Sequence, residues 1–355
     1  MALCWLPFVP LLAAALLREQ RLRGVGNMCL LLGLLLMILI VAGQDYGNDQ
    51  NNYQLYYESV DWSNAFTFGL ERGYVLSMVL CKEVFGFDFY DYLFLINTCL
   101  IGVFLYVSWR YSRNFALSLL LFYGMYFFLY ETTALRQGVA FCFTLYSLRY
   151  IVERKALPFC ICIALGFLFH SSALLFLPAY WVASWLKVST RQAYWLIVLF
   201  FPFVFVDMVP LLGQFTQYFA DAEKYNDLYI SASGEHKERV GLGIGVVVKI
   251  IFFVMYASTY SRESVVQTAL FRIGLFYLLL YFPCSSISIL SSRGLDYYKI
   301  FDCIYLTYAL YNQKERLLRF SFSVIVFMYI TYSLWDTALG VKNFSSVLQD
   351  IVDLI

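Results

Sequence analysis

The chain consists of long apolar runs separated by short polar connections. A helix needs about 20 apolar residues to cross the hydrocarbon core of a bilayer. Runs that approach this length lie near 2–17, 27–43, 90–109, 115–130, 137–152, 156–169, 173–186, 192–208, 241–260, 268–290, 298–312 and 320–340. The pattern predicts an all-α polytopic membrane protein, in which residues 1–355 form a single bundle of about twelve (10–13) transmembrane helices.

Three of the apolar stretches are too short for an ordinary crossing. The neighbouring runs 156–169 and 173–186 fit a tight hairpin, a re-entrant pair or one long tilted helix. Residues 74–85, inside a polar stretch, are typical of a helix that lies in the interface or dips into the bundle.

Lys and Arg residues fall in every second connection between the runs. Short loops rich in these residues face the cytoplasm. The alternation therefore assigns both termini and two long polar segments, 44–89 and 209–240, to the extracytoplasmic side. The basic residues that carry this assignment are Arg18, Arg21, Arg23, Arg110, Arg113, Arg149, Arg154, Lys155, Lys187, Arg191, Arg262, Lys314, Arg316 and Arg319.

Composition agrees with a lipid environment and argues against several other classes of protein. The chain is 61% hydrophobic and 14% charged, whereas a soluble domain is about a quarter charged. Its net charge of +1 offers no basic face, so we expect no nucleic acid partner. The nine cysteines lie mostly in apolar runs and form no Cys-x-x-Cys pair, which favours packing roles over disulfides or a metal site.

Two arginines stand on the predicted outer face, against the usual bias. Arg136 lies at the outer start of an apolar run, and Arg293 lies at an outer helix end. Arginine suits bidentate binding of phosphate, so the pair could hold a lipid-linked diphosphate. Interface anchoring, or ion pairs with Glu131 and Asp296, would explain the same positions.

His170 lies at the outer turn between the two short runs. Histidine titrates near neutral pH and suits the removal of a proton from a sugar hydroxyl. Glu71 and Asp45, in the first long outer segment, are alternative bases, and a packing or capping histidine is the alternative reading of His170. Tyr53 and Tyr74 in that segment suit sugar stacking, although tyrosine also concentrates at membrane interfaces.

Several of these residues occur together in motifs that resemble the EpsG family. These are bacterial polysaccharide polymerases related to the Wzy O-antigen polymerases. The chain has Arg72 where that family usually has proline, and Arg293 followed by Tyr297 is similar to its late Arg-x-x-x-Tyr. The remaining motifs, in family order, are Asp45 with the Tyr53/Tyr57 stretch, Glu71-Arg72-Gly73-Tyr74, Leu135-Arg136-Gln137-Gly138-Val139-Ala140 and Phe169-His170-Ser171-Ser172-Ala173-Leu174.

The resemblance implies a glycosyltransferase at the outer face of the bacterial inner membrane. Donor and acceptor would be glycans on undecaprenyl diphosphate, and undecaprenyl diphosphate would leave. The resemblance implies no metal or other cofactor, and it suggests a chain-length regulator as a protein partner.

Charge suggests how the site residues divide the work. Arg136 and Arg293 would stabilise the diphosphate leaving group, and His170, or Glu71 in its place, would act as the base. The predicted substrate-binding residues are Asp45, Tyr53, Tyr74, Gln137 and Tyr297.

Other membrane functions fit parts of the pattern. A lipid-linked oligosaccharide flippase would need polar residues through the depth of the bilayer, where the chain has Lys249, Asp302 and few others. An O-antigen ligase would use the same donor with another acceptor. A membrane acyltransferase that uses acyl-CoA would need its histidine on the cytoplasmic side, whereas His170 is predicted on the outer side.

Overall fold

The structure is a computed structural model that describes residues 2–18, 22–41, 50–130, 134–208, 243–287 and 290–340. These residues form helices and connecting turns, with no strand among them. Asp45, Glu131 and the segment 209–240, which the charge pattern predicts to be extracytoplasmic, lie outside the described residues. By their contacts the residues form two compact units. The single transmembrane domain over 1–355 stays a prediction.

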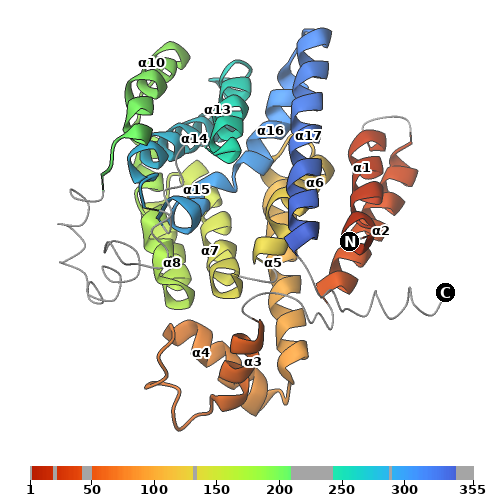
Figure 1. Cartoon of the computed structure of the whole chain (residues 1–355), viewed down its shortest axis with the longest axis vertical. Helices are drawn as coiled ribbons and strands as arrows, with labels where there is room; N and C mark the ends of the chain where they lie inside the picture. The colour runs from red at the N-terminus through yellow and green to blue at the C-terminus, as the bar shows by residue number, and fades with distance from the viewer. Residues whose placement is uncertain are drawn as a thin grey trace. The chain divides into compact units, whose positions relative to one another are not determined.

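The first unit comprises Met1–Tyr150, Lys155–Leu174 and Gln313–Ile355. Its helices, shown in Figure 1, correspond to the predicted apolar runs except for α3, which the sequence analysis did not predict. They are η1 (Ala2–Trp5), α1 (Phe8–Leu17), α2 (Arg23–Val41), α3 (Gln50–Ser59), α4 (Arg72–Val79), η2 (Leu80–Val84), α5 (Phe89–Tyr111), α6 (Phe115–Phe122), η3 (Tyr123–Phe127), α7 (Leu135–Val152), α8 (Ala156–Phe169) and α17 (Arg316–Gly340).

The second unit comprises Ile151–Arg154 and Leu175–Asn312. Helix α14 contacts most of the other helices of this unit, including α9, α10, α13 and α16. The elements here are η5 (Ser171–Phe176), which enters from the first unit, α9 (Ala179–Trp185), α10 (Thr190–Phe200), η6 (Phe201–Phe205), α13 (Ile244–Ala257), α14 (Val265–Cys284), η8 (Leu290–Gly294), α15 (Asp296–Lys299) and α16 (Asp302–Asn312).

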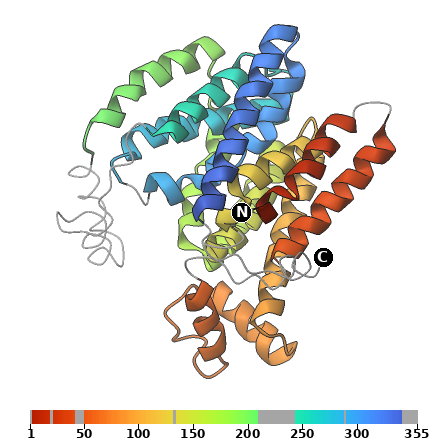
Figure 2. The ribbon, with the colours of Figure 1, turned by 45° about the vertical axis from the view of Figure 1, so that its right-hand side comes forward.

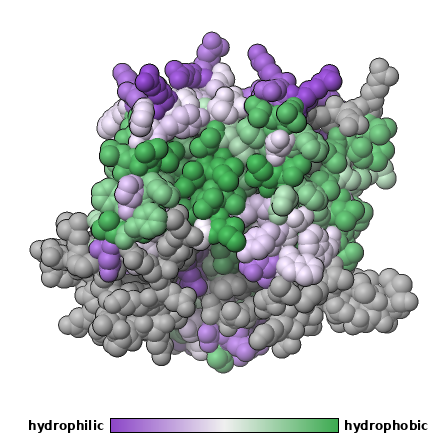
Figure 3. All heavy atoms as spheres, turned by 45° about the horizontal axis from the view of Figure 1, so that its top comes forward, coloured by the Kyte–Doolittle hydropathy of each residue, from purple (hydrophilic) through white to green (hydrophobic). Residues whose placement is uncertain are grey.

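Four of the described helices are long and apolar enough to cross a membrane: Arg23–Val41, Phe89–Tyr111, Val265–Cys284 and Arg316–Thr337. Shorter apolar helices accompany them, Ala156–Phe169 among others. Many large hydrophobic side chains are exposed, and Figure 3 shows how much of one face they cover. Such a surface fits lipid and not water, so the chain is a membrane protein. The count of about twelve crossings stays a prediction.

The polar segment that precedes α5 forms its own small core. Figures 1 and 2 both show α3 and α4 beside one end of α5. Tyr57 stacks on Tyr92 with ring centroids 5.1 Å apart, and Tyr53 meets Tyr74 edge-on at 6.2 Å. All four rings are buried. Tyr53 and Tyr74, which the sequence offers for sugar binding, therefore pack in the core of this segment.

Charged side chains fix the ends of the helices in this segment. The ammonium of Lys82 donates to the carbonyl oxygens of Glu58 at 2.8 Å and Val60 at 2.9 Å, at the end of α3. A cation there satisfies carbonyls that have no partner within the helix. Asp88 and Asp91 are spaced Asp-x-x-Asp, a pattern that pairs of metal-binding carboxylates can also show. In the structure they form a capping box at the start of α5, which accounts for the spacing.

Candidate active site on three helices of the first unit

Glu71, Arg136 and His170 meet in the first unit, although they are far apart in the sequence. Glu71 immediately precedes α4, Arg136 is the second residue of α7, and His170 directly follows α8. Glu71 Oε2 lies 2.7 Å from Arg136 Nη1, and Glu71 Oε1 lies 3.0 Å from His170 Nδ1. One carboxylate thus joins an arginine and a histidine through its two oxygens.

Close packing at two glycines brings the three helices together. A Cβ on Gly73 would lie 2.8 Å from both the Cβ and the carbonyl oxygen of Leu168, so only glycine lets α4 approach α8 this closely. A Cβ on Gly166 would lie 3.3 Å from the carbonyl oxygen of Ala140 in α7. Neither glycine stands out in the sequence by its pattern alone, although Gly73 lies within the motif around Glu71.

The backbone around His170 turns the side chain toward Glu71. His170 leaves the helix in an extended conformation (φ −157°, ψ 122°), while its N–H still donates to the carbonyl of Gly166 at 2.9 Å. The preceding Phe169 stacks on Phe143 of α7, with ring centroids 5.5 Å apart. The end of α8 is therefore held against α7, which favours one position of the imidazole.

Electrostatic forces keep Glu71 ionised. Burial by itself raises the pKa of this carboxyl group. The hydrogen bond with His170 and the charge of Arg136 outweigh burial, and they lower the pKa to about 2. Glu71 is consequently a carboxylate at neutral pH, and a carboxylate with so low a pKa is a weak base.

Arg136 is charged and only partly covered. Burial lowers the pKa of its guanidinium, but the Glu71 carboxylate outweighs burial and raises that pKa overall. Its side chain is 29% exposed, compared with 18% for Glu71 and 23% for His170. Its Nε is buried without a hydrogen-bond partner. All three side chains can therefore meet a ligand, and Arg136 has donor capacity beyond its bond to Glu71.

Tyr53 and Tyr74 lie behind this cluster. Their rings are 5% and 0% exposed. Tyr53 contributes to the raised pKa of Arg136. Burial raises the pKa of Tyr74 well above its usual value, so this phenol stays neutral. Direct sugar stacking by either ring stays a prediction, and in this structure both support the site from within the core.

Three further predicted residues have different surroundings. Arg293 is exposed, in the turn η8 of the second unit, and Tyr297 is fully buried in α15. The neighbouring Asp296, which the sequence offered as a partner for Arg293, forms an ion pair with Lys299. Gln137 is 2% exposed in α7. Roles for these residues in binding stay predictions, as does the role of Asp45.

The described residues contain no group of three or more His, Cys, Asp or Glu side chains placed to hold a metal ion. None of the nine cysteines, all of which lie in the described ranges, forms a disulfide.

Comparison with known proteins supplies one match. The model of the EpsG family matches residues 28–346. No curated protein and no solved structure matches the chain. The matched range contains Glu71, Arg136, His170 and Arg293, so the whole candidate site lies inside it.

Proposed function

This chain belongs to the EpsG family, whose members are Wzy-like polysaccharide polymerases, and we propose that it joins oligosaccharide repeat units carried on undecaprenyl diphosphate. Donor and acceptor are both lipid-linked glycans, and undecaprenyl diphosphate is released. The reaction takes place at the extracytoplasmic face of the bacterial inner membrane. The Glu71–Arg136–His170 cluster is the observation that carries this proposal beyond the family level.

The reaction transfers a glycan from one carrier to another. A hydroxyl oxygen on the terminal sugar of the acceptor attacks the anomeric carbon of the donor, and the bond from that carbon to the diphosphate breaks. The hydroxyl proton passes to a base, and the bonding electrons leave with the diphosphate. The site must therefore supply one proton acceptor and positive charge for the leaving group.

His170 is the proposed base, and Glu71 orients it. Because Glu71 is ionised, its oxygen 3.0 Å from His170 Nδ1 can only accept a hydrogen bond. A neutral His170 then carries its proton on Nδ1, and Nε2 is left with a lone pair that can accept the hydroxyl proton. Where the sequence left His170 and Glu71 as alternative bases, the geometry favours a pair with separate tasks.

Arg136 is the proposed contact for the diphosphate. Its guanidinium is beside the base and partly exposed, which suits stabilisation of negative charge as the glycosidic bond breaks. Arg293 is a second proposed contact, on the basis of its motif alone. With positive charge supplied by arginine, the proposed reaction needs no metal.

The sidedness of the site has a direct test. Single cysteines at positions 136, 170 and 293, in a background without the native cysteines, should react with an impermeant thiol reagent added to the periplasmic side. Labelling from the cytoplasmic side only would overturn the extracytoplasmic assignment.

The function itself is tested with purified protein and a synthetic lipid-linked repeat unit. The expected product is a ladder of longer glycans, formed without ATP and in the presence of a chelator. Arg136→Ala and His170→Ala should abolish the ladder while the protein remains folded. A protein that only moves the lipid-linked unit across vesicles, with no ladder from several matching repeat units, would instead be a flippase.

Lys249 and Asp302, the charges within apolar runs that a flippase would need, contact each other in the second unit. Lys249 of α13 forms an ion pair with Asp302 of α16, and the two side chains are 5% and 1% exposed. Their contact supports a role for this pair in helix packing, which leaves the polymerase as the preferred proposal.

A further inference from the structure

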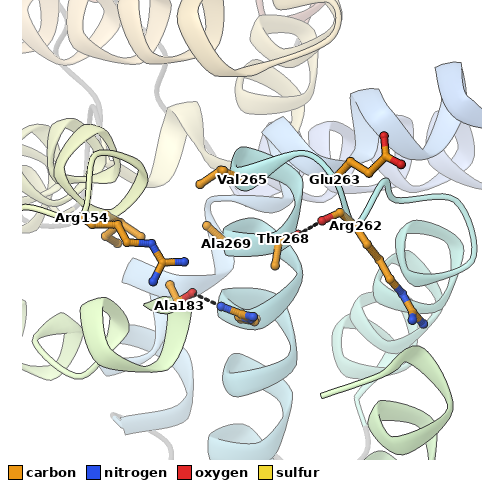
Figure 4. Close-up of a pocket in the computed structure, with 9 residues that line it drawn as sticks. Arg154, Ala183, Arg262, Glu263, Val265, Thr268 and Ala269 are labelled. Atoms are coloured by element: carbon orange, nitrogen blue, oxygen red, sulfur yellow. Dashed lines mark hydrogen bonds between the residues drawn. The ribbon is translucent and has the colours of Figure 1, made fainter. Parts of the chain in front are cut away.

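A cluster of arginines lies in the second unit, and none of its members is assigned a part in the proposed reaction. Arg154, Arg262 and Arg272 line a cavity of about 210 Å³ together with Glu263 and Thr268. Figure 4 shows the cavity around the first half of α14, with Arg154 and Ala183 on one side of that helix. Three arginines against one glutamate give the lining an excess of positive charge.

Two of these guanidiniums are fixed on the same backbone oxygen. Arg154 Nη1 and Arg272 Nη1 each lie 3.2 Å from the carbonyl oxygen of Ser184, and Arg272 Nη1 also lies 2.6 Å from that of Ala183. Two like charges are thereby held side by side at the end of α9. Neither forms an ion pair with a carboxylate in the described part of the chain. Each guanidinium has five N–H donors, and these contacts use only one of its nitrogens.

Arg262 contributes differently. In Figure 4 its side chain extends away from Arg154, and its Nη2 lies 3.3 Å from Thr190 Oγ1. The centre of positive charge in the cavity is therefore the pair Arg154 and Arg272.

The backbone conformation at Arg154 indicates that its side chain has a functional role. Arg154 has φ 58°, in the left-handed region, and it closes a Schellman motif at the end of α7. The N–H of Lys155 donates to Tyr150 at 2.9 Å, and the N–H of Arg154 donates to Ile151 at 3.3 Å. Glycine is favoured at this position because any Cβ is strained there. An arginine in this conformation is explained if its guanidinium is needed in the cavity.

The position of the cavity in the membrane points to the source of its ligand. Arg154, Arg191 beyond α9, and Arg262 belong to three connections that the charge pattern places on the cytoplasmic side. Trp185, next to Ser184, is 68% exposed, and exposed tryptophan is typical of the membrane interface. Basic pockets at this depth suit the headgroups of anionic lipids.

We propose that Arg154 and Arg272 form a binding site for a phosphate group at the cytoplasmic surface, supplied by the headgroup of an anionic phospholipid. Paired guanidiniums match the oxygens of a phosphate, and a bound phosphate relieves their mutual repulsion. The site is separate from the proposed polymerase reaction and does not depend on it.

The test measures binding to the purified full-length protein in a neutral detergent. The probes are dihexanoyl-phosphatidylglycerol, the phosphate-free dihexanoylglycerol and inorganic phosphate, and the readouts are thermal midpoint and native mass spectrometry. Phosphatidylglycerol should bind, dihexanoylglycerol should not, and Arg154→Gly should weaken phosphatidylglycerol binding by about tenfold or more, since hydrogen bonds to charged groups contribute strongly.

Arg154→Gly is a favourable variant because the left-handed turn suits glycine, so loss of binding is not a sign of unfolding. Arg272→Lys keeps the charge without the fork and should also weaken binding. Arg191→Ala, an exposed arginine on the same predicted side, is the matched control and should bind like the original protein.

Binding of inorganic phosphate alone, lost in Arg154→Gly, would support the site and assign it to a soluble phosphate compound. Equal binding of phosphatidylglycerol by Arg154→Gly and the original protein, or no binding of either anion, would overturn the proposal.

Discussion

Gly73 and Leu168 are in contact so close that any side chain on Gly73 would collide with the backbone of α8. A Cβ there would lie 2.8 Å from the Leu168 carbonyl oxygen. This contact sets the distance between α4 and the end of α8, and hence between Glu71 and His170. Gly73→Ala should therefore push the two apart and reduce polymer formation by about tenfold or more, with a stability loss of about 1–3 kcal/mol typical of overpacking.

The control for that variant is Gly69→Ala. Gly69 lies in the same polar segment before α5, and a Cβ on it would meet nothing within 4 Å. It should leave the glycan ladder and the thermal midpoint unchanged. If Gly73→Ala also leaves both unchanged, the glycine contact does not position the site.

The Glu71 carboxylate should stabilise the protein in a pH-dependent manner. Its pKa falls from 4.5 to about 2 in the folded state, so its stabilisation is present above pH 4.5 and is lost as the pH falls toward 2. The shift corresponds to about 3 kcal/mol at neutral pH. Glu71→Gln should therefore lower the thermal midpoint at pH 7, and the difference from the original protein should shrink between pH 4.5 and pH 3. A difference that does not depend on pH would contradict the ion-pair account.

His170→Ala should reduce the rate of glycan transfer by about a hundredfold or more, the range expected for loss of a general base. Binding of the lipid-linked donor should change little, because Arg136 remains. His236→Ala is the comparison, since this histidine lies in the polar stretch 209–240 of the sequence and has no predicted part in the reaction. Initial rates from the glycan ladder measure both. Retained activity in His170→Ala would move the base to another residue.

The contributions of Lys249 and Asp302 to the stability of the protein should depend on each other. Removal of one member of a buried ion pair leaves an uncompensated charge and costs about 3–5 kcal/mol. Lys249→Met and Asp302→Leu should each lower the thermal midpoint strongly, while the double variant should recover most of the loss. Additive losses in the double-mutant cycle would show that the contact contributes little.

Asp88 should stabilise the start of α5 and have no metal-dependent effect. Its side chain accepts a hydrogen bond from the N–H of Asp91 at 2.8 Å. Asp88→Ala should cost about 1 kcal/mol, and Asp88→Asn should cost much less because asparagine also caps helices. Thermal midpoints with and without a chelator separate the two explanations. A midpoint that falls on chelation in the original protein would favour a metal instead.

Most of the helical pattern follows from the sequence, because apolar runs must cross or enter lipid. The predicted run 156–169 is helix α8 without change, and 90–109 lies within α5. Helix α3 was missed, since its polar and aromatic residues give no apolar run and it is stabilised by contacts with α4 and α5. The run 173–186 divides into η5 and α9 at Leu177 and Pro178, consistent with proline at a helix start.

The sequence by itself determined that this is a membrane protein, which family it resembles, and which polar residues stand out among apolar ones. Composition and local motifs carry that information because each depends on neighbouring residues only. Tertiary structure decided that Glu71 joins Arg136 and His170, that Lys249 meets Asp302, and that Arg154 meets Arg272 at the end of α9. These contacts connect distant parts of the chain, and they depend on how closely the helices approach one another. At Gly73 that approach is set by the absence of a Cβ, and this absence matters only because α4 lies against α8 in the folded protein.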